Sequence, residues 1–216
     1  MTGHDGDPVP PTRWERIVDT TATPYVENFT RLLDAGQDVD GEARLADVLA
    51  PRGARVLDAG AGIGRVAAGL ARRGHGVTAV EKDPALVALC RARFPEVPVV
   101  RADILELSAS LLEAAGRPTA YDVVVLVGNV MVYLADGTET RALRTLERLL
   151  APGGRVLVGF HPLEGPEHSR DYPFALFASH VRAAGLEVLL HLGGYDLAPA
   201  GEDYVVAVLG RPAVLD

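Results

Sequence analysis

Short apolar runs alternate with stretches of helical periodicity from about residue 50 onward. The run Val123–Val127 is uninterrupted, which is typical of a central strand buried on both faces. This alternation of strands and helices predicts right-handed crossovers and a parallel sheet with helices on both faces. Strands are predicted at Arg55–Ala59, Gly76–Val80, Val97–Arg101, Asp122–Val127 and Arg155–Phe160, with helices near Gly64–Arg73, Pro84–Phe94, Ala109–Ala115 and Thr138–Leu150.

The pattern changes after the fifth predicted strand. Tyr172–Ala184 has the spacing of a helix, and Gly185 follows where a helix C-cap is expected. Two strands, Glu187–Leu192 and Tyr204–Leu209, come next with only a loop rich in Gly and Pro between them. Consecutive strands without a helix between them indicate an antiparallel hairpin at the end of the sheet.

The N-terminal part of the chain predicts a small helical cap. Trp14–Ala35 is expected to be helical in two pieces, the second beginning at Pro24 with Thr23 as its N-cap. Another helix is expected at Glu42–Leu49. The first residues are rich in Gly, Asp, Pro and Thr, as in a flexible tail. The predicted organisation is therefore a tail at 1–12, a helical cap at 13–50 and a core domain at 51–211.

Composition restricts the partners and the compartment. The 216 residues are 48% hydrophobic and 23% charged, as in globular proteins, and the net charge of −8 argues against nucleic acid as a partner. One cysteine excludes an intramolecular disulfide and a cysteine zinc cluster, which favours a reducing cytoplasm.

The longest apolar run, Val123–Val132, is about half the ~20 residues that cross a membrane. The N-terminus lacks the basic start and apolar stretch of a signal peptide. We expect a cytoplasmic protein without membrane contact.

A glycine loop follows the first predicted strand and opens the next helix. It contains Gly60, Gly62 and Gly64, which permit a tight turn and close backbone approach to a ligand at a helix N-terminus. Glu81 ends the second strand, 21 residues after Gly60, near the ~20 expected for an acid that binds ribose hydroxyls. Together these residues predict a nucleoside-containing ligand.

The spacing of the glycines distinguishes two classes of cofactor. The dinucleotide fingerprint is G-x-G-x-x-G, and here Arg65 stands where its third glycine would be. Asp58, two residues before Gly60, suits a ligand with an amino group better than a pyrophosphate. An NAD-dependent oxidoreductase is kept as an alternative, although it gives no reason for Asp103.

The sequence resembles the class I S-adenosylmethionine-dependent methyltransferases over roughly residues 40–210. Its helices before residue 50 resemble those of small actinobacterial-type members. The residues that carry the resemblance are the first motif Asp58-Ala59-Gly60-Ala61-Gly62-Ile63-Gly64, the acid Glu81, the third motif Arg101-Ala102-Asp103-Ile104, Tyr121-Asp122 at the fourth strand, and Leu149-Leu150-Ala151-Pro152-Gly153-Gly154 before the fifth.

The resemblance implies a fold and a cofactor. The fold would be α/β: a Rossmann-like, doubly wound, seven-stranded sheet, mostly parallel with the last strand antiparallel, in an α/β/α sandwich with an N-terminal helical cap. The cofactor would be S-adenosylmethionine, with S-adenosylhomocysteine as product. The implied cofactor-binding loop contains Gly60, Ala61, Gly62 and Gly64, which would pass beneath the methionine and ribose.

The resemblance also implies roles for side chains around the cofactor. Asp58 would lie near the methionine amine, and Glu81 would hold the ribose hydroxyls. Asp103 would accept the adenine amino group. The remaining implied contacts are Lys82 beside the adenine edge, Ile104 against the ring, and Asn129 facing the transferable methyl group.

The acceptor is less well specified by the sequence. The resemblance implies methyl transfer to an oxygen or nitrogen of a small molecule, since Gly128-Asn129-Val130-Met131 replaces the Asn-Pro-Pro-Tyr-like element of enzymes that methylate DNA bases or glutamine. His161, one residue past the fifth strand, is the candidate base, with a loop histidine bonded to backbone as the alternative. Substrate-wall candidates are Tyr25, Tyr133 and Tyr172, with Trp14, Phe29 and Phe174 as further aromatics and core packing as the alternative for each.

The other histidines lack the spacing of metal ligands, so no metal site is expected. A non-catalytic module that binds the adenosyl cofactor stays open as a second alternative, because a retained pocket does not imply turnover. The sequence is compatible with a monomer or a homodimer.

Overall fold

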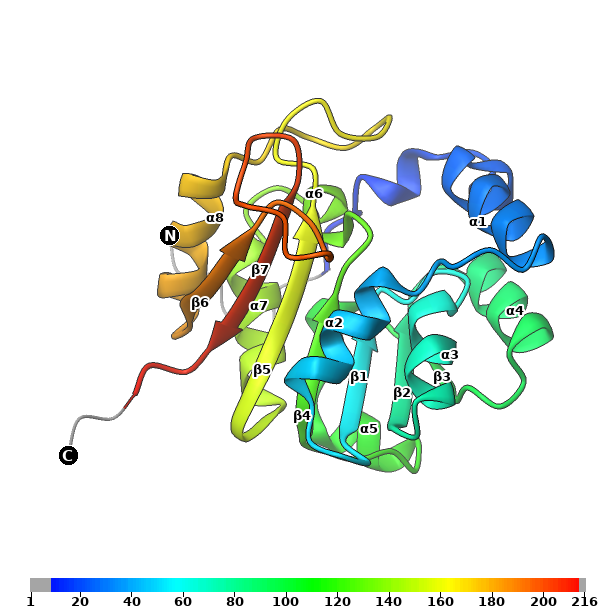
Figure 1. Ribbon diagram of the computed structural model, residues 1–216, viewed down its shortest axis with the longest axis horizontal. Helices are drawn as coiled ribbons and strands as arrows, with labels where there is room; N and C mark the ends of the chain where they lie inside the picture. Colours follow the sequence, from blue (N-terminus) through cyan, green and yellow to red (C-terminus); the bar gives the residue numbers. More distant parts are fainter. Residues whose placement is uncertain (1–8, 214–216) are drawn as a thin grey trace.

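The computed structural model describes residues 9–213 and contains a seven-stranded sheet in the order β3-β2-β1-β4-β5-β7-β6 (Figure 1). All neighbouring strands from β3 to β5 are parallel, whereas β7 runs antiparallel to both β5 and β6. The predicted fold class, including the C-terminal hairpin, is confirmed. The strands are β1 (Arg55–Ala59), β2 (Gly76–Glu81), β3 (Val99–Arg101), β4 (Tyr121–Leu126), β5 (Leu150–Phe160), β6 (Glu187–Leu192) and β7 (Val205–Gly210).

Helices cover both faces of this sheet (Figure 1). One hydrophobic cluster contains residues of α5, α7 and α8, and a second contains residues of α2, α3 and α4. The α-helices are α1 (Pro24–Asp34), α2 (Gly41–Leu49), α3 (Arg65–Arg72), α4 (Pro84–Arg93), α5 (Ala109–Ala114), α6 (Val130–Tyr133), α7 (Glu139–Arg148) and α8 (Phe174–Ala183), and the 3-10 turns are η1 (Trp14–Arg16), η2 (Thr20–Ala22) and η3 (Ile104–Glu106).

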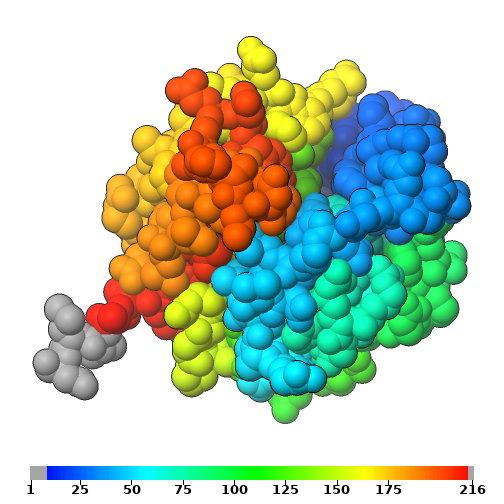
Figure 2. Space-filling model, in the orientation of Figure 1, coloured from blue at the N-terminus to red at the C-terminus, as the bar shows by residue number. Residues whose placement is uncertain are grey.

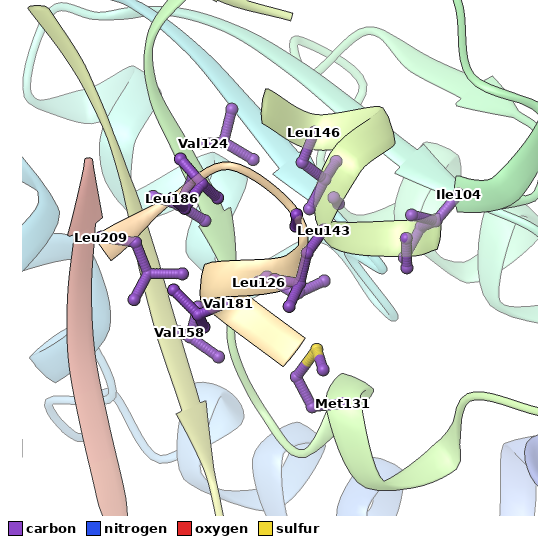
Figure 3. Close-up of a cluster of buried hydrophobic side chains, with 14 of the residues drawn as sticks. Ile104, Val124, Leu126, Met131, Leu143, Leu146, Val158, Val181, Leu186 and Leu209 are labelled. Atoms are coloured by element: carbon purple, nitrogen blue, oxygen red, sulfur yellow. The ribbon is translucent and has the colours of Figure 1, made fainter. Parts of the chain in front are cut away.

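The central strand β4 supplies side chains to both clusters in alternation. Val124 and Leu126 face the α5/α7/α8 side, where Figure 3 shows them among the buried aliphatic side chains. Val123 and Val125 face the α2/α3/α4 side. All four are fully buried, so the continuous apolar run follows from burial of the strand on both faces.

The direction in which the chain winds reverses between β1 and β4. From β1 the chain proceeds outward through β2 and β3, and it then returns to place β4 on the other side of β1. Val56 of β1 is in register with Val77 on one side and with Val123 on the other. In sheets of this kind the carboxyl ends of the strands at such a reversal flank a ligand-binding crevice.

The N-terminal segment is less helical than its sequence predicts. The second piece begins at Pro24, where Thr23 Oγ1 accepts a hydrogen bond from Val26 N, as expected for an N-cap. The first piece forms only η1 and η2, which contain no buried residues to stabilise a longer helix. Of the predicted tail, residues 1–8 lie outside the described residues, whereas Val9 packs on the core and Thr12 is buried.

The largest other differences from prediction are at the start of β5 and just after β4. β5 begins at Leu150 rather than Arg155, because Leu150 pairs with Tyr121 of β4 ahead of a register shift. The four-residue helix α6 follows β4, and it is too short for its periodicity to be visible in sequence. Within residues 9–213, no helix is long and apolar enough to cross a membrane.

Candidate active site

A pocket of about 860 Å³, including space open to solvent, lies at the carboxyl ends of β1, β2 and β4. Ten residues predicted to contact the cofactor or the substrate line it. At this end of the molecule Figure 2 shows the N-terminal segment around α1 (blue) facing the loop after β5 (yellow). The ten predicted residues in the pocket wall are Trp14, Tyr25, Gly60, Gly62, Glu81, Lys82, Asp103, Ile104, Asn129 and Tyr133.

The glycine loop bends back from β1 toward β2. The amides of Gly60 and Ala61 both donate to the carbonyl oxygen of Val80, and three glycines have positive φ, including Gly60 at 80°. A Cβ on Gly60 would lie 2.6 Å from Cγ2 of Val130 on α6. The loop therefore presents bare backbone to the pocket, and neither its conformation nor its packing accommodates a side chain at Gly60. Gly64, outside the pocket wall, has φ 83° and precedes α3.

Glu81 joins the glycine loop to the end of β2. Its Oε2 accepts a hydrogen bond from Gly62 N, and its Oε1 accepts one from Asp83 N, both at 2.9 Å. Burial raises the pKa of this carboxyl above its usual range despite the two hydrogen bonds. The carboxylate lines the pocket with lone pairs to spare for ligand hydroxyls.

Asp58 lies behind the glycine loop rather than in the pocket wall. It is 2% exposed, and its Oδ2 accepts a hydrogen bond from Ala67 N in the first turn of α3. Burial raises its pKa to about 7, although the nearby charge of Arg65 acts in the opposite direction. The glycine loop therefore separates Asp58 from the pocket, so its expected contact with a ligand amine would not be a direct one.

Arg65, where a dinucleotide fingerprint would have glycine, has a structural environment of its own. Its guanidinium pairs with Glu42 of α2 at 2.5 Å and stacks on the ring of Phe29, 4.1 Å from the centroid. Both charged side chains are largely buried. Arg65 thereby joins α1, α2 and α3 beneath the loop.

Lys82 connects the pocket to the N-terminal segment. Its Nζ lies 2.8 Å from Oδ2 of Asp103 and 2.9 Å from Oε2 of Glu15. Burial disfavours the charge of Lys82, but the hydrogen bonds to the two carboxylates outweigh it and raise its pKa. Oδ1 of Asp103 accepts from Leu105 N, so the aspartate also caps η3.

Aromatic side chains form much of the remaining wall. Trp14 packs edge-on against Tyr133, with ring centroids 5.2 Å apart, and both line the pocket. Tyr25 reaches over the glycine loop, where its hydroxyl oxygen would be 3.1 Å from a Cβ on Gly62. Burial raises the pKa of Tyr25 to about 12, so its phenol is neutral at physiological pH.

Tyr172 is a correction to the predicted substrate wall. It is fully buried in the α5/α7/α8 cluster, against Phe160 and Phe177, and is not part of the pocket wall. Its hydroxyl is bonded to Nδ1 of His180 at 2.7 Å. The aromatic ring completes the core and its polar atom is satisfied there, so the core-packing alternative is correct for Tyr172.

His161 lies just behind the pocket wall. Its backbone N–H and its ring Nδ1 both contact Oδ1 of Asn129, at 2.8 and 3.0 Å. The ring also packs edge-on against Tyr204, with centroids 4.7 Å apart. Burial lowers the pKa of His161, so the imidazole is neutral near pH 7.

Several pocket residues were absent from the sequence prediction. Thr12 fell within the predicted tail, and Leu134 and Pro166 lie in loops without a recognisable motif. These residues reach the pocket through tertiary packing, and their sequence signal is no stronger than that of any loop. Within residues 9–213, no group of three or more His, Cys, Asp or Glu side chains is placed to hold a metal ion.

Comparison with known proteins places this geometry in a family. Residues 56–154 match a methyltransferase domain family. A solved TehB-like SAM-dependent methyltransferase from Corynebacterium glutamicum is 35% identical, with a TM-score of 0.75, over 87% of this chain and 96% of that one. The chain belongs to the class I SAM-dependent methyltransferases.

Two curated relatives support this methyltransferase assignment over shorter regions. An uncharacterized methyltransferase of Mycobacterium bovis is 38% identical over 115 residues, 53% of this chain and 54% of its own. A ubiquinone biosynthesis O-methyltransferase of Xanthomonas euvesicatoria is 30% identical over 145 residues, 62% of this chain and 59% of its own. The chain thus spans little more than half the length of these two curated relatives.

The pocket of the methyltransferase fits S-adenosylmethionine in the chemistry of its walls. Gly60 and Gly62 leave a cradle that side chains would fill. Glu81 at the end of β2 and Asp103 just after β3 provide carboxylates. Ribose hydroxyls and an adenine amino group both need such hydrogen-bond acceptors. Oδ2 of Asp103 is buried, and its one ion-pair partner among the described residues is Lys82, which leaves an acceptor position for a ligand.

Proposed function

We propose that this protein transfers the methyl group of S-adenosylmethionine to a small-molecule acceptor. When bound, the cofactor supplies an electrophilic methyl group on a sulfonium. The protein itself supplies position and exclusion of water. The glycine loop, Glu81 and Asp103 are proposed to hold the cofactor, with Ile104 against the adenine and Asn129 toward the methyl group.

A single observation carries this proposal. The glycine loop after β1, Glu81 at the end of β2, Asp103 after β3 and Asn129 after β4 all line one pocket. These residues are scattered over 70 positions in the chain, and the parallel sheet brings them to the same edge. Such convergence of a bare backbone loop with two carboxylates supports an adenosyl ligand.

The wall beyond the cofactor residues supports a small, uncharged and partly apolar acceptor. Trp14, Tyr25 and Tyr133 supply aromatic surface, and Pro166 closes the pocket from the loop after β5. Oxygen and nitrogen acceptors both suit such a wall. The name of the Xanthomonas relative supports oxygen.

The cellular setting is also proposed. The single cysteine, Cys90, is fully buried, which is compatible with a reducing cytoplasm. The net charge of −8 supports an acceptor other than nucleic acid. A monomer or a homodimer would serve this function equally.

Calorimetric titration tests the cofactor assignment. We expect S-adenosylmethionine and S-adenosylhomocysteine to bind with micromolar Kd and NAD not to bind. Binding of NAD alone would instead support an oxidoreductase. Binding of the adenosyl pair, without release of S-adenosylhomocysteine over a broad panel of phenols, amines and carboxylic acids, would favour a non-catalytic module.

A further inference from the structure

A hydrogen-bonded pair, Asn129 and His161, joins the ends of β4 and β5 beside the pocket. We infer that Asn129 holds His161 in the neutral form protonated on Nδ1, so that Nε2 accepts the proton of a hydroxyl acceptor. This inference rests on the proposed methyl transfer and names the acceptor class for that site. His161 would be the catalytic residue, and Asn129 a positioning residue that acts through it.

The hydrogen bonds determine which ring nitrogen carries the proton. The backbone N–H of His161 can only donate, so the Asn129 atom 2.8 Å away must be the amide oxygen. The same oxygen lies 3.0 Å from Nδ1 of His161. Because an amide oxygen only accepts, Nδ1 must carry the proton. In a neutral ring the lone pair is then on Nε2.

The backbone at Asn129 is arranged for this contact. Asn129 has a φ of 74°, an uncommon conformation for a residue other than glycine, and it follows Gly128 with a φ of 71°. Its backbone N–H donates to the carbonyl oxygen of Gly159 on β5. The turn thereby directs the Asn129 side chain toward the residue two positions beyond Gly159, which is His161.

His161 contacts one pocket residue, Asn129, and lies near the segment that supplies another. Asn129 lines the pocket, and so does Pro166 in the loop after β5. A Cβ on the neighbouring Gly165 would lie 3.6 Å from Cβ of His161. Among the described residues, Nε2 of His161 has no hydrogen-bond partner. It is also not one of their fully buried polar atoms, so it is open to solvent. Since Asn129 and Pro166 line the pocket, the proposal requires an acceptor that enters between them and reaches Nε2.

The surroundings of His161 keep the ring neutral. Burial lowers its pKa, and Asp203, in the loop before β7, opposes this effect. The other titratable group packed on the ring is Tyr204, whose pKa burial raises to about 12. Its hydroxyl lies 3.3 Å from that of Tyr195, which burial also keeps neutral. Among residues 9–213, Asp203 is the one anion whose charge acts on the imidazole.

A positioned neutral imidazole matters for a hydroxyl more than for an amine. An amine can arrive already deprotonated, whereas a hydroxyl retains its proton until it attacks. In the proposed methyl transfer, the O–H proton of the acceptor moves to Nε2 of His161 as the acceptor oxygen bonds to the methyl carbon. The methyl–sulfur bond breaks and its electron pair stays on sulfur, while the positive charge passes from the sulfonium to His161.

Imidazole NMR tests the positioning without an acceptor. In the ¹⁵N-labelled protein, with and without S-adenosylhomocysteine, long-range ¹H–¹⁵N spectra at pH 7.5 should show His161 protonated on Nδ1. His161→Gln identifies the signal, and His168→Gln, an exposed histidine of the same loop, is the matched control. A His161 ring protonated on Nε2 in the unaltered protein would overturn the inference.

Two variants of Asn129 separate positioning from folding. Asn129→Gly keeps the positive φ and removes the amide, so the His161 ring should lose its preference for the Nδ1 proton. Asn129→Asp restores both hydrogen bonds with a carboxylate and should raise the titration midpoint of His161 by about 1 pH unit. An unchanged tautomer in Asn129→Gly would contradict the positioning role.

Turnover tests the proton transfer. With a panel of phenols as acceptor probes, His161→Gln should lower kcat by about 10²–10⁴-fold with unchanged S-adenosylmethionine affinity. The acid limb of kcat should follow the NMR midpoint and shift with Asn129→Asp. Methylation of amines only, or full phenol turnover in His161→Gln, would refute the inference. Failure to bind either adenosyl compound would instead refute the proposed function, whereas the His161 spectra would still report the tautomer.

Discussion

The indole Nε1 of Trp14 donates a hydrogen bond to Oδ2 of Asp83 at 2.9 Å. Asp83 is the N-cap of α4 and uses its other oxygen to accept from Ala85 N. This one carboxylate therefore fixes both the start of α4 and the N-terminal segment that covers the pocket. Trp14 lines the pocket, so the contact holds an aromatic wall in place.

Trp14 should report ligand binding, because it is the single tryptophan of the chain and lies in the pocket wall. We expect its fluorescence to change on titration with S-adenosylhomocysteine, with a midpoint equal to the calorimetric Kd. Trp14→Phe should abolish the signal while calorimetry still detects binding. Emission that stays constant up to saturation would contradict the placement of Trp14.

Glu81→Ala should weaken binding of S-adenosylmethionine by about 1.5–3 kcal/mol, or roughly ten- to a hundredfold. The reason is that a buried carboxylate, which accepts hydrogen bonds from the ligand, is lost. Calorimetry measures the change. Asp122→Ala is the control, since Asp122 is also a strand carboxylate but pairs with Arg55 near the amino end of β4. Equal affinities in the two variants would argue against ribose binding by Glu81.

Gly60→Ala should both destabilise the protein and abolish cofactor binding. The added Cβ meets a positive φ of 80° and a 2.6 Å contact with Val130. Gly185→Ala is matched in backbone conformation, with φ 85°, but has nothing within 4 Å. In urea denaturation we expect Gly60→Ala to cost about 1–3 kcal/mol more than Gly185→Ala. A similar loss in both variants would mean that Val130 moves aside.

Glu42→Gln should cost about 3 kcal/mol of stability, because it leaves the buried Arg65 guanidinium without its counter-charge. Urea denaturation measures this cost. Asp38→Asn breaks the pair of Asp38 with Arg44, in which both side chains are more than half exposed, and should change stability far less than Glu42→Gln does. The prediction fails if the buried and exposed pairs give the same change.

Asp58 should make stability fall as pH rises. Burial raises its pKa to about 7 in the folded protein, from an ordinary value of 3.8. Between these values the folded state binds the proton and the unfolded state does not, so each increase in pH favours unfolding. Asp58→Asn, whose amide oxygen can still accept from Ala67 N, should reduce this decline in urea denaturation between pH 5 and 8, and Glu81, whose pKa burial also raises, accounts for what is left.

Asp122→Asn provides the control for that pH dependence. The hydrogen bond from Arg55 lowers the pKa of Asp122, so its stabilising effect is complete above the unfolded pKa and is lost only on acidification. Its removal should lower stability evenly between pH 5 and 8. A decline of unchanged size in Asp58→Asn would assign the pH dependence to another group.

Much of the architecture could be predicted because the sheet imposes simple patterns on the chain. Strand β4 is buried on both faces and is therefore a continuous run of Val and Leu. α1 begins at Pro24 after Thr23, where local hydrogen bonding alone defines a helix start. The short helix α6 and the early start of β5 at Leu150 were not predictable, because each depends on pairing or packing with a distant segment.

The sequence by itself determined the sheet, the glycine loop and the acids at the strand ends. These features depend on local conformation and on strand order, both of which leave a periodic or spaced signal. Only the tertiary structure decided which side chains meet. It placed Tyr172 in the core, Thr12 in the pocket wall and Asp58 behind the loop. It also brought Asn129 within hydrogen-bond distance of His161, 32 residues away, because β4 and β5 are neighbours in the sheet.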